Sequence, residues 1–312
     1  MPYIYLRGHL KIYYEIYGAE KSYPIILIHP LGGNIEIWQE EISLILKSQK
    51  YRIIAYELRG HNRSTIGDNL DFTMEDLAND LYILLNQLQI SRCTLIGHSI
   101  GGKIAAVFAK HNISMVDAIM FISGSSIPIK EDDLEDSTAI RLASTKGMAA
   151  VAYYERQKKY SKEKALQDDR HWNHFKEIFT KTSVDGFIAS RKALRTMPQN
   201  INKFLRNSDC KLFGIVGSED DVFLNLKKTM KKEIPNFEFR VIYGEGHWLV
   251  LHDPVELDKA IEGFLSEINV PNQNYLQSHS IKLTIPKTIF EKLLWIAISL
   301  PQELTIKTAL DN

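Results

Sequence analysis

The sequence predicts an α/β fold built on a mostly parallel β-sheet with helices on both faces. Three observations lead to this fold class. Continuous apolar runs such as residues 24–28 and 94–96 are typical of strands buried on both faces. Segments with helical spacing of apolar residues alternate with these runs. The alternation stops once, between residues 127 and 207, and then resumes, which indicates one insertion into a single sheet.

Composition is that of a globular protein with enough apolar residues for a core. The 312 residues are 45% hydrophobic and 24% charged, and the net charge is zero, so nothing favours a nucleic-acid partner. Cys93 and Cys210 begin strands expected two apart in the sheet, about 9–10 Å between backbones and beyond disulfide reach. No signal-peptide core or membrane span is apparent, and we expect a cytoplasmic protein without stable membrane insertion.

The first half of the chain supplies six strands and three helices. Residues 3–17 alternate apolar and polar around Gly8-His9, as a hairpin does. The helices are indicated by apolar residues at helical spacing, for example Leu77, Leu81 and Leu84. Beyond the hairpin we expect strands at 24–29, 51–56, 94–98 and 115–123, and helices at 37–46, 73–88 and 103–110.

The second half divides into an insertion, the end of the core and a tail. Residues 127–207 are polar and helical, with helices expected at 137–157 and 171–182, and they predict a helical cap, or lid, inserted after strand 6. Strands at 210–217 and 237–243 and a helix at 254–268 complete an eight-stranded sheet. The core therefore comprises residues 1–126 and 208–270.

The tail, residues 271–312, begins with a linker, Pro271-Asn272-Gln273-Asn274, and then shows a strand pattern at 281–285 and a helix pattern at 288–299. Pairing with the tail of a second copy would make a homodimer, and packing on its own subunit is an equal alternative. Contact of the tail with a membrane surface is a third, less favoured hypothesis, because the predicted helix carries few cations.

The segment Gly97-His98-Ser99-Ile100-Gly101 joins a strand to a helix. Gly-x-Ser-x-Gly at such a junction is the form of a nucleophile elbow, a sharp turn with the serine at its tip. Glycines two residues to either side avoid collisions that larger side chains would make. The motif alone is equally compatible with an ordinary turn that contains a serine.

Reactive side chains follow four of the expected strands. Ligands of open α/β sheets bind beyond the carboxyl ends of the strands, and His29, Ser99, Asp220 and His247 all stand there. A serine hydroxyl needs a base to accept its proton and a carboxylate to orient that base. The chain order Ser, Asp, His is the order found with a nucleophile elbow.

Four motifs in sequence order identify a resemblance to the α/β-hydrolase superfamily, in its lidded, esterase-like branch, over residues 1–269. They are His29-Pro30-Leu31-Gly32-Gly33, then Glu57-Leu58-Arg59-Gly60-His61-Asn62-Arg63-Ser64, then the elbow at Ser99, and finally Gly217-Ser218-Glu219-Asp220 together with Gly244-Glu245-Gly246-His247.

The resemblance implies that Ser99 is the nucleophile, His247 the general base and Asp220 the orienting carboxylate, with Glu219 and Asp221 as local alternatives to Asp220. It further implies an oxyanion hole made of the backbone N–H groups of Leu31 and Ile100. The latter lies at a helix N-terminus, where N–H groups are unpaired.

Three residues depart from the family pattern. Pro30 stands for glycine, which stiffens the oxyanion loop but leaves the N–H of Leu31. Glu57 replaces aspartate and Asn62 replaces glycine in the arginine-containing turn. Asparagine tolerates a left-handed backbone, so we expect this turn to persist.

Other polar residues are expected to be structural. We expect His98 to be a packed strand residue, His29 to hold its own loop, and Arg59 and Arg63 to brace their turn. A further pair, His171 and His174, lies three residues apart in the insertion, but no additional ligands support a metal site.

The resemblance predicts a serine hydrolase, foremost a carboxylesterase on small or medium acyl substrates, with no cofactor and no metal. The same triad also cleaves lactones, thioesters, amides and certain C–C bonds, so these substrate classes remain alternatives to esters. Epoxide and haloalkane hydrolysis are disfavoured, because those branches carry aspartate where Ser99 stands. A ligand-binding receptor or pseudoenzyme on the same fold is the alternative from another class.

Overall fold

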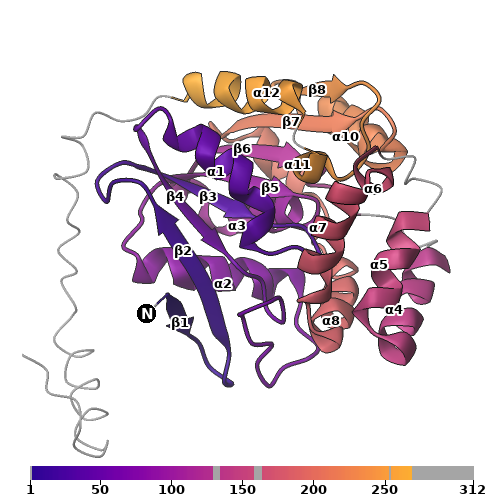
Figure 1. The fold of residues 1–312 in the computed structure, drawn as a ribbon. Coiled ribbons are helices and arrows are strands. Elements are labelled where there is room, and N and C mark those ends of the chain that lie inside the picture. Colours follow the sequence, from indigo (N-terminus) through magenta and orange to yellow (C-terminus); the bar gives the residue numbers. More distant parts are fainter. Residues whose placement is uncertain (1, 129–133, 158–163, 253, 269–312) are drawn as a thin grey trace, which may run out of the picture. The chain divides into compact units, whose positions relative to one another are not determined.

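The computed structural model describes residues 2–128, 134–157, 164–252 and 254–268. Its centre is an eight-stranded sheet with the order β1-β2-β4-β3-β5-β6-β7-β8 (Figure 1). β1 and β2 pair antiparallel, as do β2 and β4, and every later pair is parallel. The predicted mostly parallel, eight-stranded α/β sheet is therefore confirmed.

The strands form where the sequence predicts them. Gly8 and His9 adopt left-handed φ angles between β1 and β2, as expected of the hairpin turn. β6 lies between β5 and β7, which separates Cys93 from Cys210, and both thiols are free. The strand bounds are Tyr3–Tyr5 (β1), Lys11–Tyr17 (β2), Tyr23–Ile28 (β3), Tyr51–Tyr56 (β4), Cys93–His98 (β5), Val116–Ile122 (β6), Lys211–Gly217 (β7) and Glu238–Ile242 (β8).

Helices cover both faces of the sheet, and β3 shows why. Ile25 and Leu27 face one apolar cluster, while Ile26 and Ile28 face another. The first cluster includes residues of α1 (Gln39–Leu46) and α12 (Val255–Ser266), and the second includes residues of α2 (Met74–Gln87), α3 (Ile100–Asn112) and α10 (Asp221–Glu233). A strand buried on both sides needs an unbroken apolar run, as the sequence has.

Helix ends follow local chemistry. The N-cap of α2 is Thr73, whose hydroxyl accepts from the N–H of Asp76 while the Asp76 carboxylate accepts from the N–H of Thr73. This reciprocal capping box satisfies two N–H groups that the helix itself leaves unpaired. One short 3₁₀ helix, η1 (Ile35–Trp38), precedes α1, and a second, η2 (Ile113–Met115), follows α3.

The segment between β6 and β7 is helical, as predicted. The expected helix at 137–157 is interrupted at Gly147, whose φ of 78° is left-handed and ends a helix. In Figure 1, α7 and α8 lie beside the sheet, and α4 and α5 pack on their outer side. The helices are α4 (Leu134–Lys146), α5 (Met148–Gln157), α6 (Lys164–Gln167), α7 (Asp169–Thr180), α8 (Val184–Leu194) and α9 (Ile201–Arg206).

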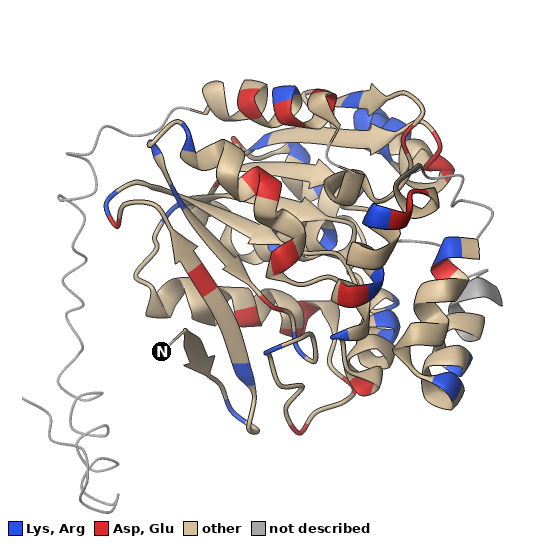
Figure 2. Cartoon of the chain, in the orientation of Figure 1, with Lys and Arg blue, Asp and Glu red and all other residues tan. Residues whose placement is uncertain are grey.

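Charged residues of both signs are interspersed over the outer helices in the view of Figure 2. Among the described residues, no helix combines the length and the apolar character needed to cross a bilayer.

The tail, with its predicted strand at 281–285 and helix at 288–299, lies outside the described residues. The short helix α11 (Leu249–His252) completes the described elements.

Two lysines are fully buried on the α3/α10 side of β6. The ammonium of Lys103 donates to Ser125 Oγ at 3.0 Å and to the carbonyl of Ile127. Lys227 Nζ donates to the carbonyls of Phe121 at 2.9 Å and Gly124 at 2.7 Å. Both therefore hold the loop that leaves β6, and burial lowers the pKa of Lys103 to about 7.

The Lys103→Met variant tests this buried charge. Below pH 7 the lysine is charged in both states, and burial penalises only the folded one. The penalty is relieved as the pH rises from about 7 towards the unfolded pKa near 10.5, because the unfolded state then binds more protons. Wild-type stability should gain up to about 1.4 kcal/mol per pH unit across this window from this one group.

We expect Lys103→Met to lack this increment, so the difference in unfolding free energy between the two proteins should change with pH. Urea unfolding at pH 7, 8, 9 and 10 measures it. Parallel curves for wild type and variant would contradict the assignment.

Candidate active site

The turn between β5 and α3 places Ser99 in a strained backbone conformation. Its φ of 54° and ψ of −115° are rare for a residue with a side chain. A Cβ at Gly97 would lie 2.4 Å from the carbonyl carbon of Gly101, and a Cβ at Gly101 would lie 2.1 Å from the oxygen of Ile28. Both glycines are therefore required for the turn to close, as the motif predicts.

Ser99, His247 and Asp220 form a continuous hydrogen-bonded chain. His247 Nε2 lies 3.0 Å from Ser99 Oγ, and His247 Nδ1 lies 2.8 Å from Asp220 Oδ2. A carboxylate can only accept, so Nδ1 carries the proton and Nε2 is free to accept the serine proton. The side chain of His247 is 24% exposed, whereas that of Asp220 is 7% exposed, so the imidazole reaches solvent and the carboxylate is shielded.

The surrounding elements hold Asp220 and His247 in place. Asp220 is the N-cap of α10, and its Oδ1 accepts from the N–H of Phe223 at 3.3 Å, leaving Oδ2 for the histidine. His98 Nε2 donates to the carbonyl of His247 at 2.8 Å, which fixes the backbone at His247. His98 is fully buried, and burial lowers its pKa well below the usual value, so it is a neutral, packed strand residue as expected.

The two expected oxyanion donors belong to different elements. Ile100 is the first residue of α3, and Leu31 lies in the loop that follows β3. Within the described part of the chain, neither backbone N–H has a hydrogen-bond acceptor. Unpaired N–H groups of this kind can stabilise a developing oxyanion.

The peptide unit that carries the Leu31 N–H is fixed from its carbonyl side. The oxygen of Pro30 accepts from His29 Nδ1 at 2.8 Å and from the N–H of Gly33 at 2.9 Å. In a trans peptide the N–H points opposite to the C=O, and no described peptide is cis. Holding the Pro30 carbonyl therefore aims the Leu31 N–H away from it. His29 thus holds its own loop, as predicted.

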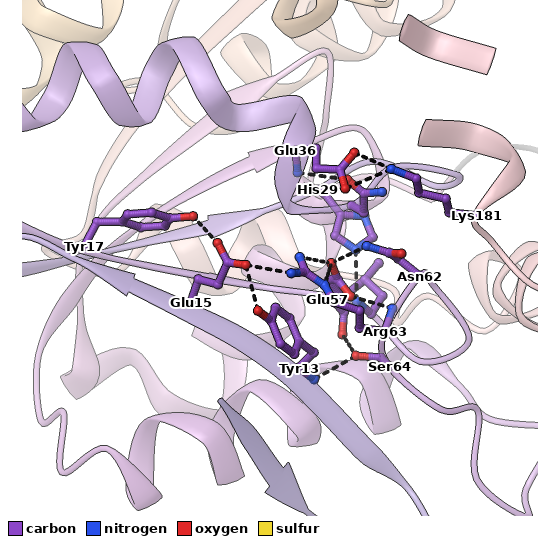
Figure 3. Close-up of polar contacts among 12 residues, drawn as sticks. Tyr13, Glu15, Tyr17, His29, Glu36, Glu57, Asn62, Arg63, Ser64 and Lys181 are labelled. Carbon is purple, nitrogen blue, oxygen red and sulfur yellow. Dashed lines mark hydrogen bonds and ion pairs between the residues drawn. The ribbon is translucent and has the colours of Figure 1, made fainter. Parts of the chain in front are cut away.

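The arginine-containing turn is held by a charge network around the buried carboxylate of Glu57 (Figure 3). Glu57 is fully buried and accepts from Arg63 Nη2 at 2.6 Å and from Asn62 Nδ2 at 2.9 Å. Asn62 has a φ of 45°, the left-handed backbone expected at this departure from the family pattern. Arg63 also donates to Glu15 at 2.7 Å, so it braces the turn. Arg59 does the same through a buried ion pair with Asp80.

His171 and His174, the two histidines of the inserted segment, line a cavity of about 680 Å³ with His252, Glu36 and Glu40. His252 Nδ1 bonds Glu245 at 2.6 Å, and its ring packs edge-on against His171. Among the described residues, no three His, Cys, Asp or Glu side chains are arranged to bind a metal ion.

Sequence reasoning missed three residues that support the site. His61 and Lys227 contact the loops around Ser99. His61 stands in the arginine-containing motif, but the motif predicts no contact with Gly32, and nothing near Lys227 in the sequence marks that residue. Lys103 could have been noticed, because it is the one charged residue between Ile100 and Ala109 in an otherwise apolar helix. A lone lysine in such a stretch is a buried charge in need of partners.

The family assignment rests on a sequence comparison. Residues 23–254 match the family described as "alpha/beta hydrolase fold". This chain belongs to the α/β-hydrolase family. The match begins at β3 and ends just before α12, so it includes Ser99, Asp220 and His247.

Individual α/β hydrolases resemble the chain to different extents. A structure from a study of carboxylesterases of the thaumarchaeon Nitrososphaera gargenis is 45% identical, with a TM-score of 0.82, covering 86% of this chain and 98% of that one. Epoxide hydrolase 3 of Xenopus tropicalis is 27% identical over 85% of this chain and 77% of its own. A putative carbamate hydrolase RutD of Variovorax paradoxus is 28% identical over 38% of this chain, and the match spans only 44% of that protein.

The elbow glycines can be tested against a glycine elsewhere. Gly101→Ala places a Cβ 2.1 Å from the Ile28 oxygen, and we expect a loss of more than about 3 kcal/mol of stability, or no folded protein. Gly263→Ala is the control, because that α12 glycine has open space around it and alanine favours a helix by about 0.5–1 kcal/mol. Thermal unfolding of both variants measures the contrast. Equal midpoints would contradict the steric argument.

Proposed function

We propose that this α/β hydrolase is a serine hydrolase, a carboxylesterase that acts on small or medium acyl esters. The observation that carries the proposal is the position of His247, which contacts Ser99 Oγ with one ring nitrogen and Asp220 with the other. The 45% identity to a structure from a study of archaeal carboxylesterases supports the same substrate class.

In the proposed reaction, Ser99 Oγ attacks the ester carbonyl carbon while its proton moves to His247 Nε2. The N–H groups of Leu31 and Ile100 stabilise the tetrahedral oxyanion. His247 then protonates the departing alcohol, and the acyl group remains on Ser99. Water attacks the acyl-enzyme with His247 as base, and the acid leaves. Asp220 stabilises the imidazolium at each step, and no cofactor or metal takes part.

Epoxide opening fits this site poorly, although one relative is named an epoxide hydrolase. A carboxylate that attacks an epoxide forms an ester, which water can cleave with a histidine base. A serine hydroxyl would form an ether, and this site offers no way to cleave it. Ser99 therefore favours acyl transfer, and lactones, thioesters and C–C substrates of the same triad remain as alternatives.

We further propose that residues 127–207 form a lid that shapes the acyl site. Its α7 packs against the site, because the ring of Phe175 lies 4.7 Å from that of Trp248, the residue after His247. The two free cysteines also support the expected cytoplasmic location.

A fluorophosphonate probe and ester turnover test the proposal together. Wild type should be labelled at Ser99 and should hydrolyse p-nitrophenyl esters, with a preference that a chain-length series, lactones and thioesters would define. Ser99→Ala should abolish labelling and lower kcat to background. Asp220→Asn should lower kcat by about 10⁴-fold, because it gives His247 the wrong tautomer.

Asp221→Asn is the matched control, since Asp221 is the next residue, is exposed and has no part in the triad; its kcat should match wild type. Labelling without turnover of any acyl substrate would favour a ligand-binding receptor. Peak activity on a C–C substrate would replace the carboxylesterase assignment.

A further inference from the structure

His61 is a buried polar residue that the proposed reaction does not use. It lies in the arginine-containing turn, 0% exposed, and its ring makes two hydrogen bonds. Nδ1 lies 2.9 Å from the carbonyl oxygen of Arg59, and Nε2 accepts from the N–H of Gly32 at 3.2 Å. A carbonyl accepts only, so Nδ1 carries the proton and Nε2 is the acceptor. Burial lowers the pKa of His61 to about 4, which keeps this neutral form at neutral pH.

The bond to Gly32 fixes the second peptide unit next to Leu31. One unit, Pro30–Leu31, is held through the Pro30 carbonyl by His29 and Gly33. The other, Leu31–Gly32, is held through the Gly32 N–H by His61. With both flanking peptide planes fixed, the direction of the Leu31 N–H is determined.

The inserted segment also confines this loop. Gly32 has a φ of 77°, and a Cβ there would lie 2.3 Å from the ring of Phe179 on α7. The backbone of His61 itself pairs with Thr182, two residues after the end of α7, and the N–H of Asn62 donates to the carbonyl of Lys181 at 3.1 Å. His61 therefore joins α7 and its following turn to the oxyanion loop.

We propose that His61 is a positioning residue that aims the Leu31 N–H at the reacting carbonyl oxygen through its hydrogen bond to Gly32. Its two ring nitrogens bond the Arg59 carbonyl and the Gly32 N–H, so it acts through the loop. The proposal rests on the proposed serine-hydrolase function, because an oriented N–H matters only where an oxyanion forms. A misdirected donor raises the energy of the transition state more than that of the bound substrate, so kcat falls and KM changes little.

Two substitutions separate the hydrogen bond from the bulk of the ring. His61→Gln keeps an acceptor near the position of Nε2, whereas His61→Asn can still donate to Arg59 but is too short to reach Gly32. We expect His61→Asn to lower kcat on a p-nitrophenyl ester by about 10- to 100-fold with KM within twofold, since losing an oxyanion donor outright costs about 10²–10³. His61→Gln should recover most of the rate.

Hydrogen exchange of the Gly32 amide gives a readout that does not depend on turnover. It should be slow in wild type and His61→Gln, and at least 10-fold faster in His61→Asn. Equal kcat in wild type and His61→Asn, equal losses in both variants, or unprotected Gly32 in wild type would each overturn the proposal. If His61→Asn does not fold, the exchange rate of the Gly32 amide in wild type and the kcat of His61→Gln still test the positioning role.

Failure of this proposal is distinguishable from failure of the proposed function. Turnover that survives in Ser99→Ala would refute the serine mechanism, whereas the Gly32 exchange would still report whether His61 holds the loop. Turnover lost in Ser99→Ala but unchanged in His61→Asn would refute the positioning role alone.

Discussion

The close approach of three backbone segments at the elbow is the constraint on which the site depends. The helix α3 starts so near β3 that Gly101 leaves no room for a Cβ beside the oxygen of Ile28. This contact sets the distance between the start of α3, which carries the Ile100 N–H, and the loop after β3, which carries the Leu31 N–H. The left-handed backbone of Ser99 costs about 1–3 kcal/mol, and the N–H of Ser99 is anchored to the carbonyl of Ile122 at 2.9 Å.

Three buried, neutral histidines hold the loops around Ser99 by hydrogen bonds. His29, His61 and His98 are all completely buried, and each hydrogen-bonds a backbone group of a loop around Ser99. Burial lowers the pKa of each, so none of the three takes up a proton near neutral pH. His247 differs from them because its ring is partly exposed and has a carboxylate partner, and these are the properties of a residue that exchanges protons.

Much of the fold and the principal site could be predicted from sequence, because both depend on local patterns. Unbroken apolar runs predict the buried strands. The glycines on either side of Ser99 predict the elbow, and the motifs that follow the other strands predict the residues near it. The helix break at Gly147 was not predicted, because a single glycine occurs both at helix ends and, at some cost in stability, inside helices. The His61–Gly32 contact joins residues 29 positions apart through side-chain orientation, and periodicity contains no information about it.

The close backbone contact between Gly60 and Gly186 limits which sequence changes the inserted segment can accept. A Cβ at Gly60 would lie 2.4 Å from the Cα of Gly186, and the N–H of Ser183 donates to the Gly60 carbonyl at 2.9 Å. The outer helices α4 and α5 make no such backbone contact with the arginine-containing turn among the described residues. Residues 181–186 can therefore change only together with the core residues that they touch, whereas α4 and α5 are under no such backbone constraint from the arginine-containing turn.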